Sequence, residues 1–236
     1  MSSLISSPLS ATELTGSFSR EAFAAHLETV KHLPAWWLDR KRVAYEKFSA
    51  LPMPARTNEA WRFSNISTLT LDGFTVSGNA LPTALLPTPF GSPALTFVNN
   101  RLSARSVLTG ELVAKGVVVS TLNEAATKHA ELLKAHFMAQ PQKLGSEKFA
   151  ALHTAFVSDG AFIYIPRGVK LTEPIIITHA VAGQGSAVFP HTLVVAEEPT
   201  PTDLRRSRGA QCCHDVAGQR DVDPRALRIA GPKVLE

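Results

Sequence analysis

Residues 156–198 read FVSDGAFIYIPRGVKLTEPIIITHAVAGQGSAVFPHTLVVAEE, and this stretch decides the fold. Turn signals such as Asp159-Gly160 and Glu173-Pro174 divide it into short segments. Between the turns stand apolar runs, several of them rich in β-branched residues, at 162–165, 169–171, 175–177 and 193–195. Runs this short and of this composition predict strands rather than helices.

The short connections between these runs narrow the architecture. Several hold only two or three residues, too few for a helical crossover, so they are either hairpins or the corners of a coil. They lack the Asn-Gly or Asp-Gly pair that a two-residue hairpin prefers, except at Asp159-Gly160, which precedes the first run. We therefore predict a β-helix, a solenoid of short parallel strands. An antiparallel sandwich stays open, because periodicity does not exclude it.

Composition indicates a globular chain. Its 236 residues, 44% hydrophobic and 19% charged, are enough to bury a real core. The formal charge of +4 raises the question of nucleic acid, but the basic residues are scattered and form no stripe interleaved with aromatics. We therefore expect no nucleic-acid binding. No run approaches the roughly 18 apolar residues of a membrane helix, so we expect no membrane association.

The N-terminus and the cysteines indicate the cellular compartment in which we expect the protein. Residues 1–16 are serine-rich, without the basic and long apolar regions of a secretory signal, and we interpret them as a flexible leader. The two cysteines are adjacent, and neighbouring cysteines rarely bridge one another. We therefore expect a cytoplasmic protein.

Residues 17–66 predict an N-terminal helical region. A serine N-cap opens a first helix that stops before Pro34, and this proline suits the first turn of a second helix over residues 35–50. We place Val43 on the apolar face of this second helix and Lys41 on its polar face. Two prolines after residue 51 end it.

A short aromatic segment, Trp61-Arg62-Phe63, follows the second helix. We interpret both aromatic residues as core residues and expect Arg62 to pair with Glu59 or Asp72. The alternative is an arginine that binds a ligand.

Residues 67–202 then begin the β-helix core, with an inserted helix at about 121–139. Thr121 and Glu124 match a capping box that starts this helix. Asn99-Asn100 reads as a turn between two strands, and residues 77–93, with four prolines, as irregular or inserted. Further strands are expected at 69–74, 94–98 and 116–120.

Several histidines are candidate metal or partner ligands. His129 and His136 lie seven residues apart, too far along a helix for a shared metal at the usual spacing of four. His153, His179 and His191 lie in or beside the strand block and could face a partner, but we interpret them as ordinary core or surface histidines. We therefore assign no catalytic, cofactor-binding or metal-ligating residue.

The tail, residues 203–236, breaks the pattern. Residues 1–202 hold eight arginines and nine lysines, whereas the last 34 hold six arginines and one lysine. We predict an unstructured segment that is frameshifted or otherwise foreign. Its Cys212-Cys213-His214 triplet is unsuited to a metal, because three adjacent residues do not easily wrap one tetrahedral ion.

Three stretches together resemble one family. They are the early PARTNEAWRF at 54–63, the strand and helix at 116–137, and the passage from LHTAFVSDG at 152–160 through IPRGV at 165–169 to EPIII at 173–177. Their order and spacing over residues 20–198 resemble the SufB/SufD family of iron–sulfur cluster assembly proteins. The arginine, glutamate and Trp-Arg of the early block favour its SufD branch.

The resemblance implies a fold and a function. It implies a mainly β fold with helices: an N-terminal helical region and then a right-handed parallel β-helix, incomplete here. It also implies a non-enzymatic scaffold that acts with SufB and the ATPase SufC in cluster formation and iron acquisition. The full complex handles the iron–sulfur cluster, so this chain is expected to bind no cofactor. In this family the contacts with SufB and SufC lie mostly in the C-terminal part, beyond residue 198.

Two other readings stay open. A β-helix enzyme acting on polysaccharide would need two carboxylates about 5 to 9.5 Å apart. The acids of the strand block, Asp159, Glu173, Glu197 and Glu198, are the candidates. Alternatively the chain is a truncated fragment without function, whose exposed sheet edge would make it self-associate.

Overall fold

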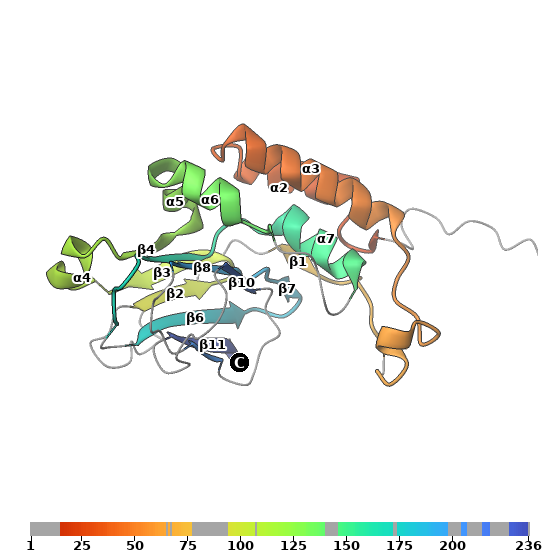
Figure 1. Cartoon of the computed structure of the whole chain (residues 1–236). Helices are drawn as coiled ribbons and strands as arrows, with labels where there is room; N and C mark the ends of the chain where they lie inside the picture. Colours follow the sequence, from red (N-terminus) through yellow and green to blue (C-terminus); the bar gives the residue numbers. More distant parts are fainter. Residues whose placement is uncertain are drawn as a thin grey trace, which may run out of the picture. The chain divides into compact units, whose positions relative to one another are not determined.

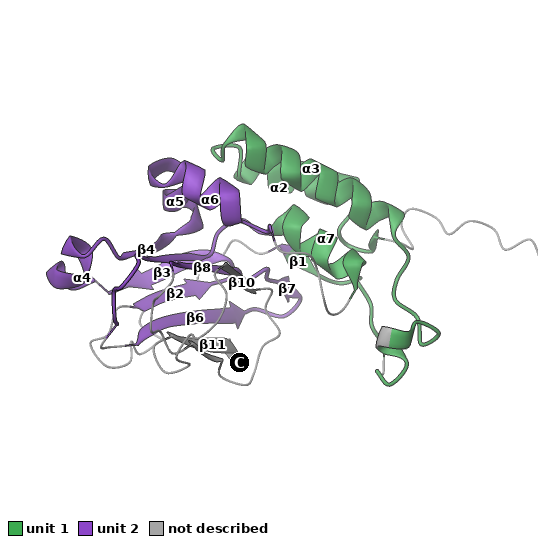
Figure 2. Ribbon diagram, viewed as in Figure 1, with its two compact units in different colours: residues 1–75, 142–156 green, residues 76–141, 157–236 purple. Residues whose placement is uncertain are grey.

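The computed structural model describes residues 15–64, 66, 68–76, 94–106, 108–139, 146–171 and 174–197, and the backbone of 204–206, 214–217 and 227–235. N-terminal helices are followed by small mixed sheets (Figure 1). The chain divides into two compact units, residues 1–75 with 142–156 and residues 76–141 with 157–236 (Figure 2). No described helix is both long and apolar enough to cross a membrane.

Unit 1 is built from helices, and the sequence predicts the first two of them. Helix α2 (Arg20–Thr29) begins at Ser19, whose hydroxyl accepts the Ala22 N–H at 3.3 Å. Helix α3 (Ala35–Ala50) follows Pro34, as predicted. The short 3-10 helix η1 (Glu59–Trp61) and helix α7 (Glu147–Phe156) complete the regular structure described in this unit.

Helix α7 was not predicted, yet it supplies part of the aromatic core of unit 1. Its Phe156 ring lies 5.3 Å from the ring of Phe18 and 5.7 Å from that of Phe23. Phe23 in turn stacks on Tyr45 at 4.2 Å. The aromatic rings therefore join α2, α3 and α7 into one core.

Two buried lysines tie α3 and α7 together. Lys41 of α3 donates from Nζ to the Ala155 carbonyl in the last turn of α7, at 3.1 Å. Lys148 of α7 donates to the carbonyls of Phe48 and Leu51, at 2.8 and 2.6 Å, where α3 ends. The last carbonyls of a helix lack partners within it and carry the negative end of its dipole. Each lysine therefore caps the other helix.

The Lys41 ammonium also lies 3.2 Å from His26 Nε2. Burial lowers the pKa of Lys41 to about 7. Burial and the neighbouring Lys41 charge lower the pKa of His26 to about 3. His26 is therefore neutral at pH 7, and its free ring nitrogen can accept from the lysine.

We expect Lys148→Met to lower the free energy of unfolding by about 2 kcal/mol. Methionine keeps most of the apolar stem, but the Phe48 and Leu51 carbonyls lose a charged donor. Urea unfolding followed by fluorescence should show a lower midpoint with an unchanged slope. The matched control is Lys47→Met, because Lys47 pairs with Glu147 on the surface and should contribute below about 1 kcal/mol. Equal losses in the two variants would argue against the capping role.

Three details of unit 1 differ from the sequence predictions. Lys41 is fully buried rather than on a polar face, and Val43 is 71% exposed rather than packed. Phe63 is 89% exposed, so it is not a core aromatic. The described residues between 68 and 74 form no strand.

Unit 2 holds the sheets. Strands β2 (Ala94–Val98) and β3 (Arg101–Arg105) form a hairpin around the predicted Asn99-Asn100 turn, and β4 (Val118–Thr121) runs into α5. The block at 156–198 gives β5 (Ala161–Ile165), β6 (Ile175–Ala182) and β8 (Thr192–Ala196), as predicted. The other elements of unit 2 are α4 (Gly110–Ala114), α5 (Leu122–Lys128), α6 (Ala130–His136) and β7 (Ser186–Ala187), and β1 (Thr75–Val76) stands where the chain passes from unit 1 to unit 2.

The two larger sheets described here are mixed. One has the order β10-β8-β5-β4 and the other β3-β2-β6-β11-β9. β5 pairs with β8, and β2 with β6, in parallel, whereas β4 on β5 and β3 on β2 are antiparallel. The described residues do not form a closed right-handed parallel β-helix, so the prediction holds only for helices followed by sheets.

Two predicted elements of unit 2 are corrected. Residues 169–171 form no strand, because the chain turns at Arg167-Gly168 and Gly168 has a φ of +74°. The single helix expected over 121–139 is divided at His129, whose φ of −134° lies outside the helical region. The result is two short helices, α5 and α6. Residues 77–93 lie outside the described part of the chain.

The core of unit 2 lies among the strands and is aliphatic. Its fully buried members come from the predicted runs of β2, β5 and β6, since a strand packed on both faces reads as a continuous apolar run. They are Leu95, Ala161, Ile163, Ile175 and Ile177. The same strand block that decides the fold therefore supplies much of the core.

The tail contributes three described strands, β9 (Leu204–Arg206), β10 (His214–Ala217) and β11 (Leu227–Leu235). β10 lies parallel to β8, and β11 lies parallel to both β6 and β9. The sequence predicts an unstructured segment here. Its foreign or frameshifted origin remains a prediction.

Candidate functional site

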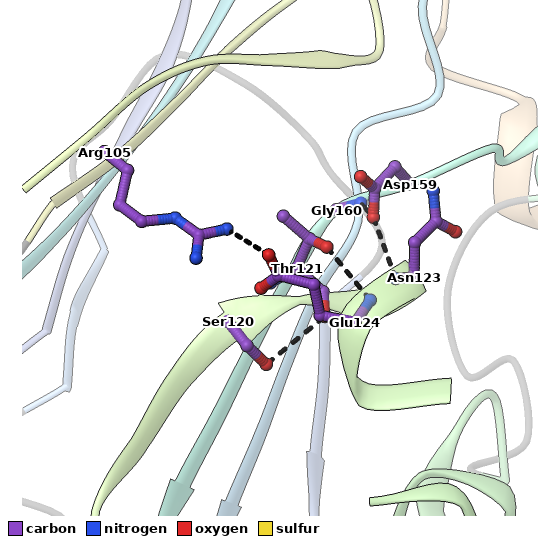
Figure 3. A network of polar contacts seen from close by, with 7 residues as sticks. All are labelled: Arg105, Ser120, Thr121, Asn123, Glu124, Asp159 and Gly160. Carbon is purple, nitrogen blue, oxygen red and sulfur yellow. Dashed lines mark hydrogen bonds and ion pairs between the residues drawn. The ribbon is translucent and has the colours of Figure 1, made fainter. Parts of the chain in front are cut away.

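A polar network joins the start of helix α5 to the sheets (Figure 3). Thr121 ends β4 and is the N-cap of α5, where its hydroxyl accepts the Glu124 N–H at 3.1 Å. Glu124 returns a carboxylate oxygen to the Thr121 N–H at 3.3 Å. The predicted capping box is thus confirmed, and it fixes the angle at which β4 passes into α5.

Arg105 extends the network to strand β3. Its guanidinium donates to the second carboxylate oxygen of Glu124 at 2.7 Å. Burial alone would raise the pKa of Glu124, but the bonds from Arg105 and Thr121, with the Arg105 charge, lower it. Glu124 is therefore held in its charged form, and it links β3 to the β4–α5 junction.

Asp159 provides the link to β5. Its Oδ1 atom accepts the N–H groups of Asn123, in the first turn of α5, and of Gly160, at 3.1 and 2.9 Å (Figure 3). Burial raises the pKa of Asp159 from 3.8 to about 6, although these backbone bonds act in the opposite direction. A carboxylate is therefore kept in an environment that favours its neutral form.

This buried carboxyl makes stability depend on pH. Below about pH 4 Asp159 is protonated in both the folded and the unfolded chain, whereas above it only the unfolded chain ionises freely. The stabilising contribution of the Asp159 carboxyl to the free energy of unfolding is therefore fully present at low pH. It is lost as the pH rises through about 6.

We expect Asp159→Asn to remove this loss. The amide oxygen can accept the same two N–H bonds without a charge, so the variant should gain about 2 kcal/mol over the parent at pH 7 and little at pH 4. Urea unfolding at half-unit pH steps measures the difference. Asp39→Asn is the control, since Asp39 is exposed on α3 and should leave the pH slope in place. Parallel profiles for the parent and Asp159→Asn would contradict the assignment.

A second polar feature holds the connection after β6. Asn99 and Asn100 have φ of +46° and +67°, the left-handed pair of a two-residue hairpin turn. Asn99 accepts the Ala182 N–H and donates to the Ala182 carbonyl, both at 2.9 Å. Asn100 likewise accepts from Phe189 N–H at 2.6 Å and donates to the Ala187 carbonyl at 3.2 Å. The two amides continue the sheet pairing after the β2 backbone has turned away.

The histidines considered from the sequence are separated in the fold. His153 lies in α7 of unit 1 and is buried. In unit 2, His179 stacks on Phe97 at 5.1 Å and His191 meets Phe137 edge-on at 5.0 Å. These ring contacts place His179 and His191 inside the apolar packing.

The helical histidines are also accounted for. His129 lies 6.2 Å from the Phe162 ring, and His136 is half-buried at the end of α6. Within the described ranges, no three His, Cys, Asp or Glu side chains gather in a way that could hold a metal ion. Cys212 and Cys213 lie outside the described residues, and of His214 only the backbone is described.

Arg62 takes one of the partners expected for it. It pairs with Glu59 at 3.0 Å, and its guanidinium lies 4.4 Å from the centre of the Phe63 ring. The pair is exposed on both sides. This arrangement supports the ion-pair interpretation over a ligand-binding arginine.

The described acids of the strand block do not form a catalytic pair. Asp159 precedes β5, whereas Glu197 follows β8 and accepts from the Tyr164 hydroxyl at 2.8 Å. Since β5 and β8 are parallel and in register, the two acids lie at opposite ends of the strands, roughly 15–20 Å apart along them. Glycosidase carboxylates are separated by about 5 to 9.5 Å. Glu173 and Glu198 lie outside the described residues.

The arrangement is suited to holding strands in place. Asp159, Asn99 and Asn100 bind main-chain groups, and Glu124 joins an arginine to a helix N-terminus. Sequence reasoning identified the capping box and the asparagine turn but not the role of Asp159. The Asp-Gly pair before an apolar run was its one available signal, and that pair indicates a turn rather than a helix contact.

Comparison with known proteins identifies the family. Residues 20–177 match the family described as the SufBD protein N-terminal region. The chain is 31% identical over 172 residues to the iron-sulfur cluster assembly protein SufD of Bacillus subtilis, covering 70% of this chain and 39% of that protein. It is 28% identical over 198 residues to an iron-sulfur cluster assembly SufBD family protein of Staphylococcus haemolyticus, covering 75% of this chain and 41% of the relative.

A SufBD family protein of Staphylococcus aureus gives a similar match, 27% over 198 residues. The chain thus spans about two fifths of the length of these curated relatives. The family match covers both the helices of unit 1 and the strands up to the start of β6. The chain therefore belongs to the SufBD family.

Proposed function

We propose that this chain is a SufD-like accessory scaffold of iron–sulfur cluster assembly, acting in the cytoplasm with SufB and the ATPase SufC. The observation that carries the proposal is the match of residues 20–177 to the SufBD N-terminal region, together with 31% identity to a protein named SufD. The proposed role is that of a partner in cluster formation and iron acquisition. The cluster itself belongs to the full complex.

The strand order supports a β-helix as the architecture of the strand region of this chain. From β5 the chain passes to β6 in the other sheet and then back to β8, which lies parallel to β5. β6 itself lies parallel to the earlier strand β2. A chain that alternates between two sheets and adds a parallel neighbour at each return follows the path of a solenoid. We propose that β5, β6 and β8 are its first coil.

The polar network supports a non-enzymatic role. Its groups bind main-chain atoms or one another, as groups that hold a scaffold do. The competing reading, a polysaccharide-active enzyme, would need two nearby carboxylates, and the distance along the strands between Asp159 and Glu197 counts against that pair.

The test is a binding experiment with a hybrid chain. Residues 1–197 are joined to the part of Bacillus subtilis SufD that follows its matched region, and the hybrid is co-expressed with tagged SufB and with SufC. We expect the hybrid to co-purify with both proteins and to restore growth to cells that lack their own SufD. The C-terminal part alone, expressed in the same way, is the control.

The chain of residues 1–236 is tested beside the hybrid. Binding of the hybrid but not of the short chain would support the scaffold role and identify the short form as a fragment without function. A folded hybrid that binds neither SufB nor SufC would refute the proposal. Release of sugars from an acidic glycan would support the enzyme instead.

A further inference from the structure

Exposed apolar side chains are concentrated in the segment of unit 1 between α3 and β1, the orange loop after α3 in Figure 1. Five large apolar side chains are exposed among the residues that the structure describes, and three of them, Phe63, Leu69 and Phe74, lie in this segment. Phe63 is the most exposed, at 89%. A ring left in water gives up the stabilisation of burial, and such a concentration is typical of surfaces that bind another molecule.

The segment is held to the helical part of unit 1 at two places. Trp61 packs on the Phe149 ring of α7, with the ring centres 6.1 Å apart. Further along, the Ser17 hydroxyl accepts the N–H groups of residues 73–74, at 2.8 and 3.3 Å. Phe63 therefore stands on an anchored segment, and such preorganisation lowers the entropic cost of binding.

The backbone around Phe63 is a compact run of turns. The Ala55 carbonyl accepts the Asn58 N–H at 2.9 Å, and the Asn58 side chain accepts the Ala55 N–H at 2.7 Å. The 3-10 helix η1 follows, and after it the Ser64 N–H donates to the Trp61 carbonyl at 2.9 Å. These bonds hold the backbone on both sides of the exposed ring.

Two arginines and one glutamate make this run basic. Arg62 is paired with Glu59, and its guanidinium covers one face of the Phe63 ring, 4.4 Å from the ring centre. Arg56 is exposed, and within the described ranges no carboxylate pairs with its guanidinium. The run from 54 to 63 thus offers a cation without an ion pair and an aromatic ring that is largely open to solvent.

We propose that residues 54–63 form a docking surface for an acidic segment of a partner protein, with an apolar side chain of the partner on the Phe63 ring and a carboxylate paired with Arg56. The basic excess selects an acidic partner. Arginine and aromatic side chains are also typical of the residues on which binding free energy concentrates. Anionic lipid headgroups are bound by clusters of about four to eight basic residues, which this run does not contain. The surface is independent of the proposed scaffold role.

Three short peptides test this surface on the chain of residues 1–236. The probe is the acidic peptide Asp-Glu-Phe-Leu-Glu-Asp. One control peptide has lysine in place of every acid, and the other has alanine in place of both apolar residues. Two-dimensional NMR spectra of the isotope-labelled chain measure the affinities. We expect the probe to bind about tenfold more tightly than either control, because it alone matches both the charge and the ring.

Variants of the chain locate the binding. Phe63→Ala should weaken binding of the probe about tenfold and Arg56→Gln about threefold, since one removes the ring and the other the charge. Val43→Ala is the matched control, because Val43 is an exposed apolar residue of α3, outside the segment. It should bind the probe as the parent does. All three side chains are exposed, so the variants should keep the parent's melting temperature.

Glu59→Gln should change the affinity in the opposite direction. It removes the one negative charge from residues 54–63, so the acidic probe should bind about threefold more tightly. A contact made by the apolar ring alone would not respond to this change.

Several results would overturn the proposal. They are equal binding of the three peptides, binding of none of them, and affinities for the probe that Phe63→Ala and Arg56→Gln leave unchanged. Self-association in sedimentation velocity that Phe63→Ala abolishes, without a preference for the acidic probe, would assign the surface to a second copy of the chain. Binding to vesicles of phosphatidylserine and phosphatidylcholine, again without that preference, would assign it to a membrane.

Discussion

Replacing Gly160 with alanine is expected to lower the free energy of unfolding by about 3 kcal/mol. A Cβ atom at this position would overlap the His191 carbonyl oxygen and would lie 2.9 Å from Cδ1 of Leu122. Gly160 also accepts the Leu122 N–H and donates its own N–H to Asp159. The residue lies where α5, β5 and the chain entering β8 converge, so neither backbone can move without breaking bonds.

The loss should appear as a melting temperature lowered by roughly 6–12 °C. The matched control is Gly110→Ala, because a Cβ at Gly110 meets no atom within 4 Å and alanine suits the helix that begins there. Gly110→Ala should be neutral or slightly stabilising. If Gly160→Ala melts within 1 or 2 °C of the parent, the close approach of the backbones is not a feature of the protein in solution.

Local signals predicted the helix ends well. Pro34 and the prolines after residue 51 bracket α3, and each acts through its own backbone chemistry whatever the rest of the chain does. The capping box at Thr121 and Glu124 is equally local, since its two bonds span three residues. Such elements can be read from a sequence because their causes lie within one turn.

Contacts distant in sequence could not be predicted in this way. Lys41 reads as one charge among several on a helix face, but its partner is a carbonyl 114 residues away at the end of α7. Lys148 reaches carbonyls about 100 residues away, and α7 itself was not predicted. Burial of a lysine follows from the partner helix, which a local pattern does not contain.

For the candidate site, too, the local features were predictable from the sequence and the contacts distant in sequence were not. The asparagine turn was predicted, but the binding of Asn99 to Ala182 spans 83 residues. The sequence indicates Asp159 only as one of the acids of the strand block, whereas its two hydrogen bonds at Oδ1 make it a link between β5 and α5. The β-helix prediction came from run spacing and resemblance, and the described pairings bear out only the helices and mixed sheets.

Asn99→Asp replaces the side-chain NH2 group with an oxygen. We expect this change to lower the free energy of unfolding by about 3–5 kcal/mol. Asn99 is 2% exposed, and its amide nitrogen donates to the Ala182 carbonyl at 2.9 Å. An aspartate would place a charged oxygen against that carbonyl with little water to screen it. The backbone should be unaffected, because aspartate tolerates the left-handed region as asparagine does.

The pH dependence of the free energy of unfolding distinguishes an effect of the new charge from an effect of the altered side-chain shape in Asn99→Asp. A buried aspartate favours its protonated form, so the variant's stability relative to the parent should be highest below about pH 4 and fall as the pH rises. Urea unfolding at pH 4 and pH 7 measures this, with Asn100→Asp as the matched control, since Asn100 is half-buried and makes a longer 3.2 Å donor bond. Asn100→Asp should lose about 1–2 kcal/mol at pH 7. Equal losses for the two aspartates, or a loss at Asn99 that does not change with pH, would show that the Ala182 pairing does not hold the connection after β6.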